Sequence, residues 1–278
     1  MLPVLRLGPF TVPVAPLAWL VAFFVLQEIG ERAAKRLKLT DDVFSGALTL
    51  TIGVGIVAAR LGYVARYLDA FLAEPLQLVA LNFGTLDLTT GALFGLIAGI
   101  AYLQRKKVSV RLFGDALAPA LALGMAVLSF GNLLTGDAFG VPASNLPWTI
   151  FLWGEMRHPV QVYELIAYLL IFWFVWTCAP LACRHAYGVS SDIVRDDMRP
   201  FEGAHFLITL ALIAGIRVLL EPLRGDSVPW VMGLRGAQVV AFVVMSMALL
   251  LFAISIQRPA RTNKHGTESP KSSNGIFS

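Results

Sequence analysis

Charged side chains inside long apolar runs are the residues of this chain best suited to chemistry. Arg217 and Glu221 are four residues apart near the end of one run, so on a helix they share a face. Arg60 falls near the end of another run, and Arg224 follows Glu221 closely. A charge within the hydrocarbon costs roughly 2.5–3.5 kcal/mol on insertion scales, so each marks a candidate site. Guanidinium groups favour an anionic ligand such as phosphate, which they bind through paired hydrogen bonds.

Further polar residues fall at the same ends of neighbouring runs. Glu164 comes three residues after Gln161, so the two share a helix face. Asn132 closes another run in a glycine-rich segment, which suits either a turn presenting backbone amides to a ligand or an ordinary loop. With Arg60, Arg217 and Arg224, these residues predict one polar pocket that opens laterally to lipid. Arginine would hold a phosphate there, and the other groups would hold glycerol hydroxyls.

Each of these residues also has a plainer structural interpretation. An arginine at a helix end can lay its stem along apolar surface and keep its charge in the headgroup region. Arg217 and Glu221 could form an ion pair that only holds a helix in place. Glu164 could complement the dipole at the start of its helix, and His158 could simply bond to backbone at the membrane rim. The residues alone leave these alternatives open.

The elements that must position these groups are membrane-spanning helices. The chain is 57% hydrophobic and 14% charged, whereas soluble domains are about 25% charged. A soluble domain cannot hide several apolar runs of about 20 residues, and a bilayer accepts them. We expect an all-α polytopic membrane protein with one domain, residues 1–256, and a disordered cytoplasmic tail, residues 257–278. The seven expected spans are residues 13–28, 43–63, 85–103, 112–133, 162–181, 203–220 and 237–256.

Positive charge is distributed unequally between the loops. Fifteen of the 22 lysines and arginines, including every lysine, follow the first, third, fifth and seventh runs. The positive-inside rule therefore predicts an outer N-terminus and a cytoplasmic C-terminus. The basic residues elsewhere are all arginine, which favours an anionic ligand on the outer side: Arg6, Arg60, Arg66, Arg157, Arg217, Arg224 and Arg235.

Several other classes of function are disfavoured. The basic residues lie in short clusters between apolar runs, so the net charge of +4 is a topology signal and predicts no nucleic-acid partner. Cys178 and Cys183 match no metal or redox spacing and are interpreted as packing residues, so no metal site is expected. The first run is too long for a signal peptide and is expected to be a retained helix.

One segment resembles a known family motif. Residues 157–164 read Arg-His-Pro-Val-Gln-Val-Tyr-Glu, similar to the His-Pro-x-Gln-x-Tyr-Glu motif of prolipoprotein diacylglyceryl transferases. The resemblance extends in order over nearly the whole chain. Its other parts are Leu7-Gly8-Pro9, Arg60-Leu61-Gly62-Tyr63, Asp115 to Pro119, Arg217 to Glu221 with Arg224, and Gln238.

Residues 128–140 align with the family signature Gly-Arg-x-Gly-Asn-Phe-x-Asn-x-Glu-x-x-Gly, with differences. The glycines at 131 and 140 and Asn132 match, and Asp137 replaces the glutamate. Ser129 stands where the family has arginine, and Thr90 where it has a catalytic histidine. The tyrosine of the family's first span has no clear counterpart near Ala15.

The resemblance implies an enzyme of the bacterial plasma (inner) membrane with no cofactor. Such enzymes transfer a diacylglyceryl group from phosphatidylglycerol to the lipobox cysteine of a prolipoprotein. The residues carried over as catalytic are Arg217, Glu221 and Glu164. Those carried over as substrate-binding are Arg60, Tyr63, Asn132, Asp137, His158, Gln161, Tyr163 and Arg224. The alternative is a relative that binds an anionic phospholipid or a lipoprotein without turnover, because Ser129 and Thr90 replace two family residues.

Overall fold

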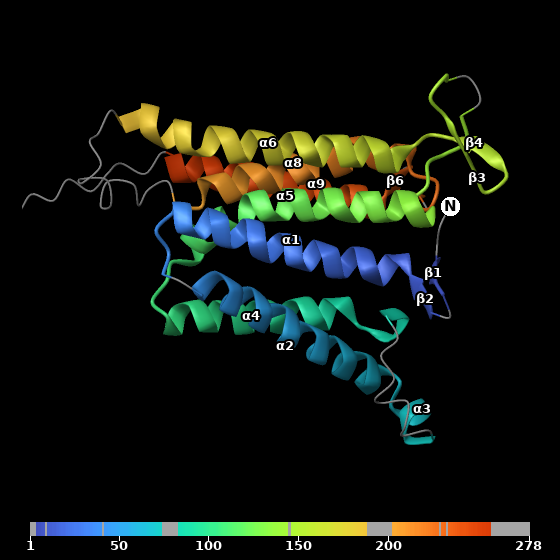
Figure 1. The fold of residues 1–278 in the computed structure, drawn as a ribbon, viewed down its shortest axis with the longest axis horizontal. Helices are drawn as coiled ribbons and strands as arrows, with labels where there is room; N and C mark the ends of the chain where they lie inside the picture. Colours follow the sequence, from blue (N-terminus) through green and yellow to red (C-terminus); the bar gives the residue numbers. More distant parts are fainter. Residues whose placement is uncertain are drawn as a thin grey trace, which may run out of the picture.

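The structure is a computed structural model that describes residues 4–8, 10–40, 42–73, 83–143, 146–187, 202–227, 229–231 and 233–256. Within these residues the helices run roughly side by side, and the short β-hairpins lie at one end (Figure 1). The helices are α1 (Val14–Arg36), α2 (Val43–Arg66), α3 (Leu68–Ala73), α4 (Leu88–Arg105), α5 (Val110–Thr135), α6 (Val160–Tyr187), α8 (Ala204–Leu220) and α9 (Gly236–Ile256), with 3₁₀ turns η2 (Phe83–Thr85) and η4 (Glu221–Leu223). The expected tail, residues 257–278, lies outside the described residues, as do the side chains of Cys178 and Cys183.

Six helices of the described part are long and apolar enough to cross a membrane: Val14–Arg36, Val43–Arg66, Val110–Thr135, Val160–Thr177, Ala204–Leu223 and Gly236–Ser255. The predicted helical membrane fold is therefore confirmed. The expected count was seven, and α4 accounts for the difference. Its 18 residues include threonines at one end and Gln104-Arg105 at the other, which lower its mean hydropathy.

Three antiparallel hairpins were not expected from the sequence: β1 (Val4–Leu7) with β2 (Phe10–Pro13), β3 (Ile150–Leu152) with β4 (Glu155–Arg157), and β5 (Pro229–Val231) with β6 (Leu234–Arg235). The β3–β4 turn has two central residues at positive φ, Trp153 at 54° and Gly154 at 85°. Two such residues match the twist of a tight hairpin. The predicted all-α class still holds, because these strands are only two to four residues long.

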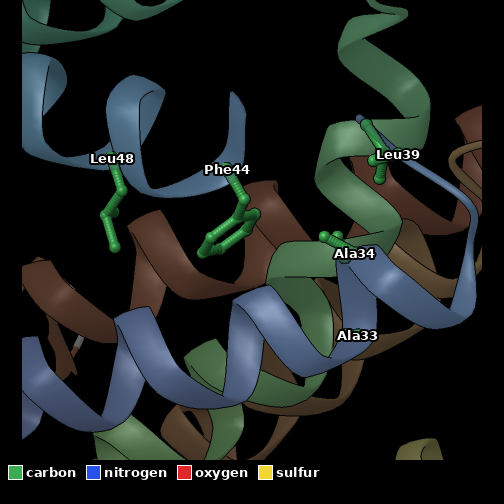
Figure 2. Close-up of a cluster of buried hydrophobic side chains, with 6 residues drawn as sticks. Ala33, Ala34, Leu39, Phe44 and Leu48 are labelled. Atoms are coloured by element: carbon green, nitrogen blue, oxygen red, sulfur yellow. The ribbon is translucent and has the colours of Figure 1, made fainter. Parts of the chain in front are cut away.

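The helix α5 lies between α1, α6 and α8 and packs against all three. Many of its side chains are small, and Ala116, Ala118, Ala120 and Ala122 are fully buried. Small residues let neighbouring helices approach closely, which replaces the missing hydrophobic driving force inside a membrane. At one end of the bundle, Phe44 and Leu48 of α2 pack against Ala33 and Ala34 of α1 (Figure 2).

Asp115 on α5 fixes the start of α8. Its carboxylate accepts hydrogen bonds from the backbone N–H groups of Gly203 at 2.7 Å and Phe206 at 3.0 Å. A carboxylate at a helix N-terminus satisfies free donors and complements the helix dipole. Asp115 belongs to α5 and therefore caps a helix other than its own. It thereby sets the axial position of α8, which carries Arg217.

The helices α2 and α4 pack through glycine. Gly91, Gly95 and Gly99 recur at every fourth residue of α4 and are buried. A Cβ atom at Gly95 would lie 2.6 Å from the backbone oxygen of Thr51 and 3.2 Å from the Cα atom of Gly55. Backbone atoms cannot rotate away as side chains can. The two main chains therefore touch directly, as in other glycine-mediated helix pairs in membranes.

Gly95→Ala is expected to lower the free energy of unfolding by about 1–3 kcal/mol, the usual cost of overpacking. The matched control is Gly53→Ala on α2, because a Cβ atom there has no other atom within 4 Å. That change should leave stability equal or slightly higher, since alanine is the better helix former. Thermal unfolding of the purified protein in detergent measures both. Equal melting temperatures for the two variants would contradict the close contact.

Candidate functional site

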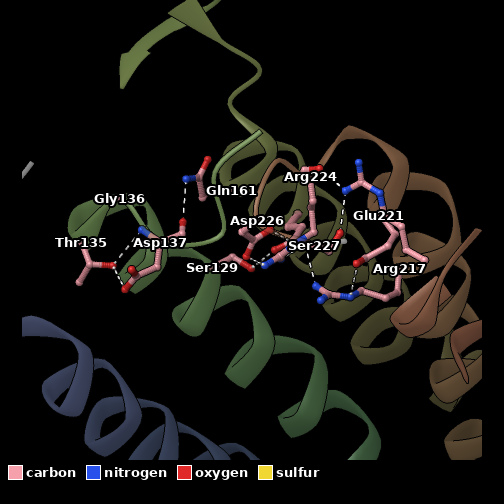
Figure 3. A network of polar contacts seen from close by, with 12 residues as sticks. Ser129, Thr135, Gly136, Asp137, Gln161, Arg217, Glu221, Arg224, Asp226 and Ser227 are labelled. Carbon is pink, nitrogen blue, oxygen red and sulfur yellow. Dashed lines mark hydrogen bonds and ion pairs between the residues drawn. The ribbon is translucent and has the colours of Figure 1, made fainter. Parts of the chain in front are cut away.

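Four predicted site residues meet in one group of ion pairs at the end of α5, α6 and α8 that lies beside the hairpins. Glu164, in the second turn of α6, has a side chain that is 4% exposed. Its Oε1 atom accepts from Arg217 Nη1 and from Arg224 Nη1, at 3.2 Å each. Figure 3 shows Arg217 next to Glu221 and Arg224 next to Asp226. Glu164 therefore joins two guanidinium groups and does more than complement its own helix dipole.

Glu221 holds Arg217 from the opposite side. Its side chain is fully buried, and its Oε2 atom lies 3.0 Å from Arg217 Nε, in the i,i+4 pair that the sequence predicts. The contact has the distance of an ion pair without the direction of a hydrogen bond. Within the described residues, neither carboxylate oxygen accepts a hydrogen bond. Arg217 therefore lies between two carboxylates. Its side chain is still 32% exposed, so one edge of it remains open.

Arg224 connects the ion pairs to the segment that follows α8. It donates to Asp226, with Nε at 2.9 Å from Oδ1. Burial lowers the pKa of the Arg224 guanidinium, but the hydrogen bond and charge of Asp226 and the charge of Glu164 outweigh it, so the net pKa is raised. Arg235 donates to the Arg224 carbonyl and, at 2.6 Å, to Ser227 Oγ. The sequence did not identify Asp226, Ser227 and Arg235 as site residues. Arg235 was, however, among the seven arginines for which the sequence favoured an anionic ligand.

Ser129 faces the same group from α5. It is 2% exposed, and its hydroxyl lies 3.4 Å from Glu164 Oε2. The position where the resembled family has arginine is therefore beside the ion pairs. Thr90, by contrast, belongs to the α4 N-terminus, where its hydroxyl donates to Asp87 Oδ2 at 3.0 Å. Asp87 also accepts from the backbone N–H groups of Thr89 and Thr90 and is therefore the N-cap of α4.

The glycine-rich segment after α5 lies next to this group. The Gln161 side chain is fully buried and donates from Nε2 to the Asp137 carbonyl at 2.8 Å. The exposed Asp137 carboxylate accepts from Thr135 Oγ1 at 2.7 Å. Gly140 forms a backbone bridge with Arg224. Asn132 lies in the last turn of α5, and its carbonyl accepts from Gly136 N at 2.8 Å. The segment thus contacts both Gln161 and Arg224.

Arg60 and Tyr63 lie apart from the ion pairs. Arg60 donates to Thr85 of η2, and its guanidinium lies over the Phe71 ring at 5.2 Å. Tyr63 packs beside Arg60 on α2, against Tyr67 and Phe71. The helix α2 packs mainly on α4. The single pocket containing Arg60 and Arg217 is therefore corrected to two separate polar regions.

His158 and Tyr163 lie on the rim near β3 and β4. The backbone N–H of His158 donates to Val141 at 3.1 Å, and its ring meets Tyr163 edge-on at 6.4 Å. The Tyr163 hydroxyl accepts from Trp148 Nε1 at 2.8 Å. These contacts connect the segment around β3 and β4 to the start of α6. In the described part of the chain, no three His, Cys, Asp or Glu side chains are grouped to hold a metal ion.

Comparison with known proteins gives one consistent family. The family model for prolipoprotein diacylglyceryl transferase matches residues 3–254. A phosphatidylglycerol–prolipoprotein diacylglyceryl transferase of Trichormus variabilis is 30% identical over 256 residues, covering 88% of this chain and 86% of that protein. Its namesake in Synechococcus elongatus is 30% identical over 264 residues, covering 87% and 86%. Another from Geobacter sulfurreducens is 34% identical over 168 residues, covering 58% and 64%.

The match spans both the apolar helices and the segments that carry Glu164, Arg217 and Arg224. It agrees with the resemblance drawn from the motif at residues 157–164. With a family model that covers almost the entire chain and relatives that align over most of it, this protein belongs to the prolipoprotein diacylglyceryl transferase family.

Proposed function

We propose that this protein transfers a diacylglyceryl group from phosphatidylglycerol to the lipobox cysteine of a prolipoprotein. The observation that carries the proposal is the convergence of Arg217 and Arg224 on one buried carboxylate, next to an exposed edge of Arg217. Two guanidinium groups in one place suit a phosphate, which they hold by charge and by paired hydrogen bonds. The names of the relatives supply the lipid and the protein substrate.

In the reaction, the cysteine sulfur forms a bond to the carbon of the diacylated glycerol that carries the phosphate. The bond from that carbon to the phosphate oxygen breaks, glycerol phosphate leaves, and the thiol proton passes to a base. Arg217 and Arg224 stabilise the charge that develops on the leaving oxygen. Glu221 orients Arg217, while Asn132 and Gln161 position the glycerol. Glu164 positions both arginines. His158 is the candidate base, and a base is needed because a free thiol has a pKa of about 8.5.

We also propose seven spans, an outer N-terminus and a cytoplasmic C-terminus in a bacterial plasma (inner) membrane. Support for α4 as the seventh span comes from its packing along α2 and from the apolar residues on its free face, Leu93, Phe94, Leu96 and Ile97, which are 50–59% exposed. Support for the orientation comes from α1 and α4, which carry basic residues in their last turns, and from the arginine-rich site at the opposite end.

The test is an adduct assay with the full chain reconstituted in phosphatidylglycerol vesicles. A peptide containing a lipobox cysteine should gain the mass of one diacylglyceryl group. The same peptide with serine in place of cysteine, and vesicles of phosphatidylcholine alone, are the controls. Lipid binding without any adduct would reject the transfer and favour a relative that binds the lipid without turnover, as Ser129 and Thr90 allow. Rescue of cells that lack their own transferase is the corresponding test in vivo.

A further inference from the structure

The Glu164 carboxylate already binds the two guanidinium groups that a phosphate would need. One of its oxygens, Oε1, lies 3.2 Å from Arg217 Nη1 and 3.2 Å from Arg224 Nη1. Its other oxygen, Oε2, faces the Ser129 hydroxyl at 3.4 Å. The side chain is 4% exposed, so little water shields these contacts. An oxygen held between two arginines is the position that a phosphate oxygen would itself take.

The charged side chains that are connected by ion pairs and hydrogen bonds at this site include as many carboxylates as arginines. Its carboxylates are Glu164, Glu221 and Asp226, which pair with Arg217 and Arg224. Its third arginine, Arg235, donates to the Arg224 carbonyl and the Ser227 hydroxyl. The groups facing Glu164 are the two arginines and Glu221 from the α8 side, Ser129 from α5, and Tyr168 one turn further along α6. The net charge of these described groups is zero. A phosphodiester entering this site would bring an uncompensated negative charge into a poorly hydrated region, at high cost.

We propose that Glu164 is an internal substitute for the lipid phosphate, and that an anionic headgroup binds only as Glu164 takes up a proton and releases Arg217 and Arg224. This inference rests on the proposed function, which supplies the anionic phospholipid. The proton comes from water and stays on the Glu164 carboxyl, where the Ser129 oxygen is within reach as an acceptor. The site then holds three cations, two carboxylates and one phosphate, and its net charge is again zero.

Proton-coupled binding has a defined consequence for pH. Binding that requires Glu164 to take up one proton becomes weaker as protons become scarcer. The affinity for the lipid should therefore fall about tenfold for each unit of pH increase, wherever Glu164 is ionised in the lipid-free protein. A lipid that carries its own cation next to the phosphate gains much less from the proton, because it adds no net charge. Glu164 therefore acts on both affinity and headgroup preference. Without it, the two arginines would bind an anionic lipid tightly at any pH.

The experiment measures the Kd of short-chain phosphatidylglycerol for the purified full chain, from about pH 5 to 9. Wild type should bind more weakly as pH rises, and calorimetry in buffers of different ionisation enthalpy should register uptake of one proton. Glu164→Gln should bind at least tenfold more tightly at the alkaline end and lose the pH dependence. Asp226→Asn is the control, because Asp226 also pairs with Arg224 but is 30% exposed. That variant should keep the wild-type pH slope.

A wild-type Kd that does not change with pH, without proton uptake, overturns the inference whether or not the glutamine variant folds. So does a folded Glu164→Gln protein that binds no more tightly than wild type, or the absence of binding at every pH. The adduct assay separates this outcome from the proposed function. Proton-coupled binding without any adduct would reject the transfer alone, whereas adduct formation with pH-independent binding would reject only the role of Glu164.

Discussion

Arg217→Ala is expected to lower the rate of diacylglyceryl transfer by about 10²–10³-fold, the usual cost of losing one donor that stabilises a developing negative charge. Arg217 lies between Glu164 and Glu221, and its exposed fraction of 32% exceeds the 10% of Arg224. It is therefore the guanidinium of this pair that presents the larger open surface to a lipid. The measurement is the initial rate of adduct formation at saturating phosphatidylglycerol.

Two further variants make the Arg217 result specific. Arg217→Lys keeps the charge but loses the planar fork, so it should recover only a small part of the rate. Arg66→Ala removes an arginine from the surface ion pair with Asp87, where Arg66 is 66% exposed. That change should leave the rate within about twofold of wild type, because exposed ion pairs contribute little. An unchanged rate in Arg217→Ala would remove this arginine from the site.

Glu221→Ala is expected to have the second largest effect, on both stability and rate. Glu221 is fully buried at 3.0 Å from Arg217. Removing one partner of a buried ion pair typically costs about 3–5 kcal/mol, because the other charge is left uncompensated. We expect a lower melting temperature and a lower kcat, since Arg217 would then be held only by Glu164. Thermal unfolding and transfer kinetics of the same preparation measure the two effects.

A double-mutant cycle tests whether Glu221 acts through Arg217. If it does, Arg217→Ala combined with Glu221→Ala should be hardly slower than Arg217→Ala alone, because the two residues work as one unit. Asp226→Asn is the matched control for loss of an acid, as its partially exposed ion pair with Arg224 should contribute less to stability. Fully additive losses in the cycle would show that Glu221 has a separate role.

Much of the ion-pair site could be predicted because it depends on local spacing. The pair of Arg217 and Glu221 follows from their i,i+4 spacing on an apolar run. The participation of Glu164 follows from the cost of a carboxylate in a span. What the spacing could not give is the order in which the helices pack. Arg60 satisfies the same rules as Arg217, but α2 packs on α4, away from the other arginines.

Other features escaped prediction for similar physical reasons. Asp115 has the position of a local cap, and only tertiary packing brings it to the amides of Gly203 and Phe206. The hairpin strands β3 and β4 have three residues each, too few for an alternating pattern to stand out. The turn between β3 and β4 did carry a sequence signal for a hairpin, because Gly154 permits the positive φ that a tight turn needs.

The glycine contact between α2 and α4 bears on how the chain assembles during synthesis. Both helices belong to the first half of the chain, and their pairing in lipid requires only close packing of the two main chains. Glu164, Arg217 and Arg224 reach the membrane later, and each lacks its partners until α6 and α8 have come together. An unfinished bundle therefore exposes unpaired charges to hydrocarbon, which favours rapid docking of α6 and α8 once both have entered the membrane.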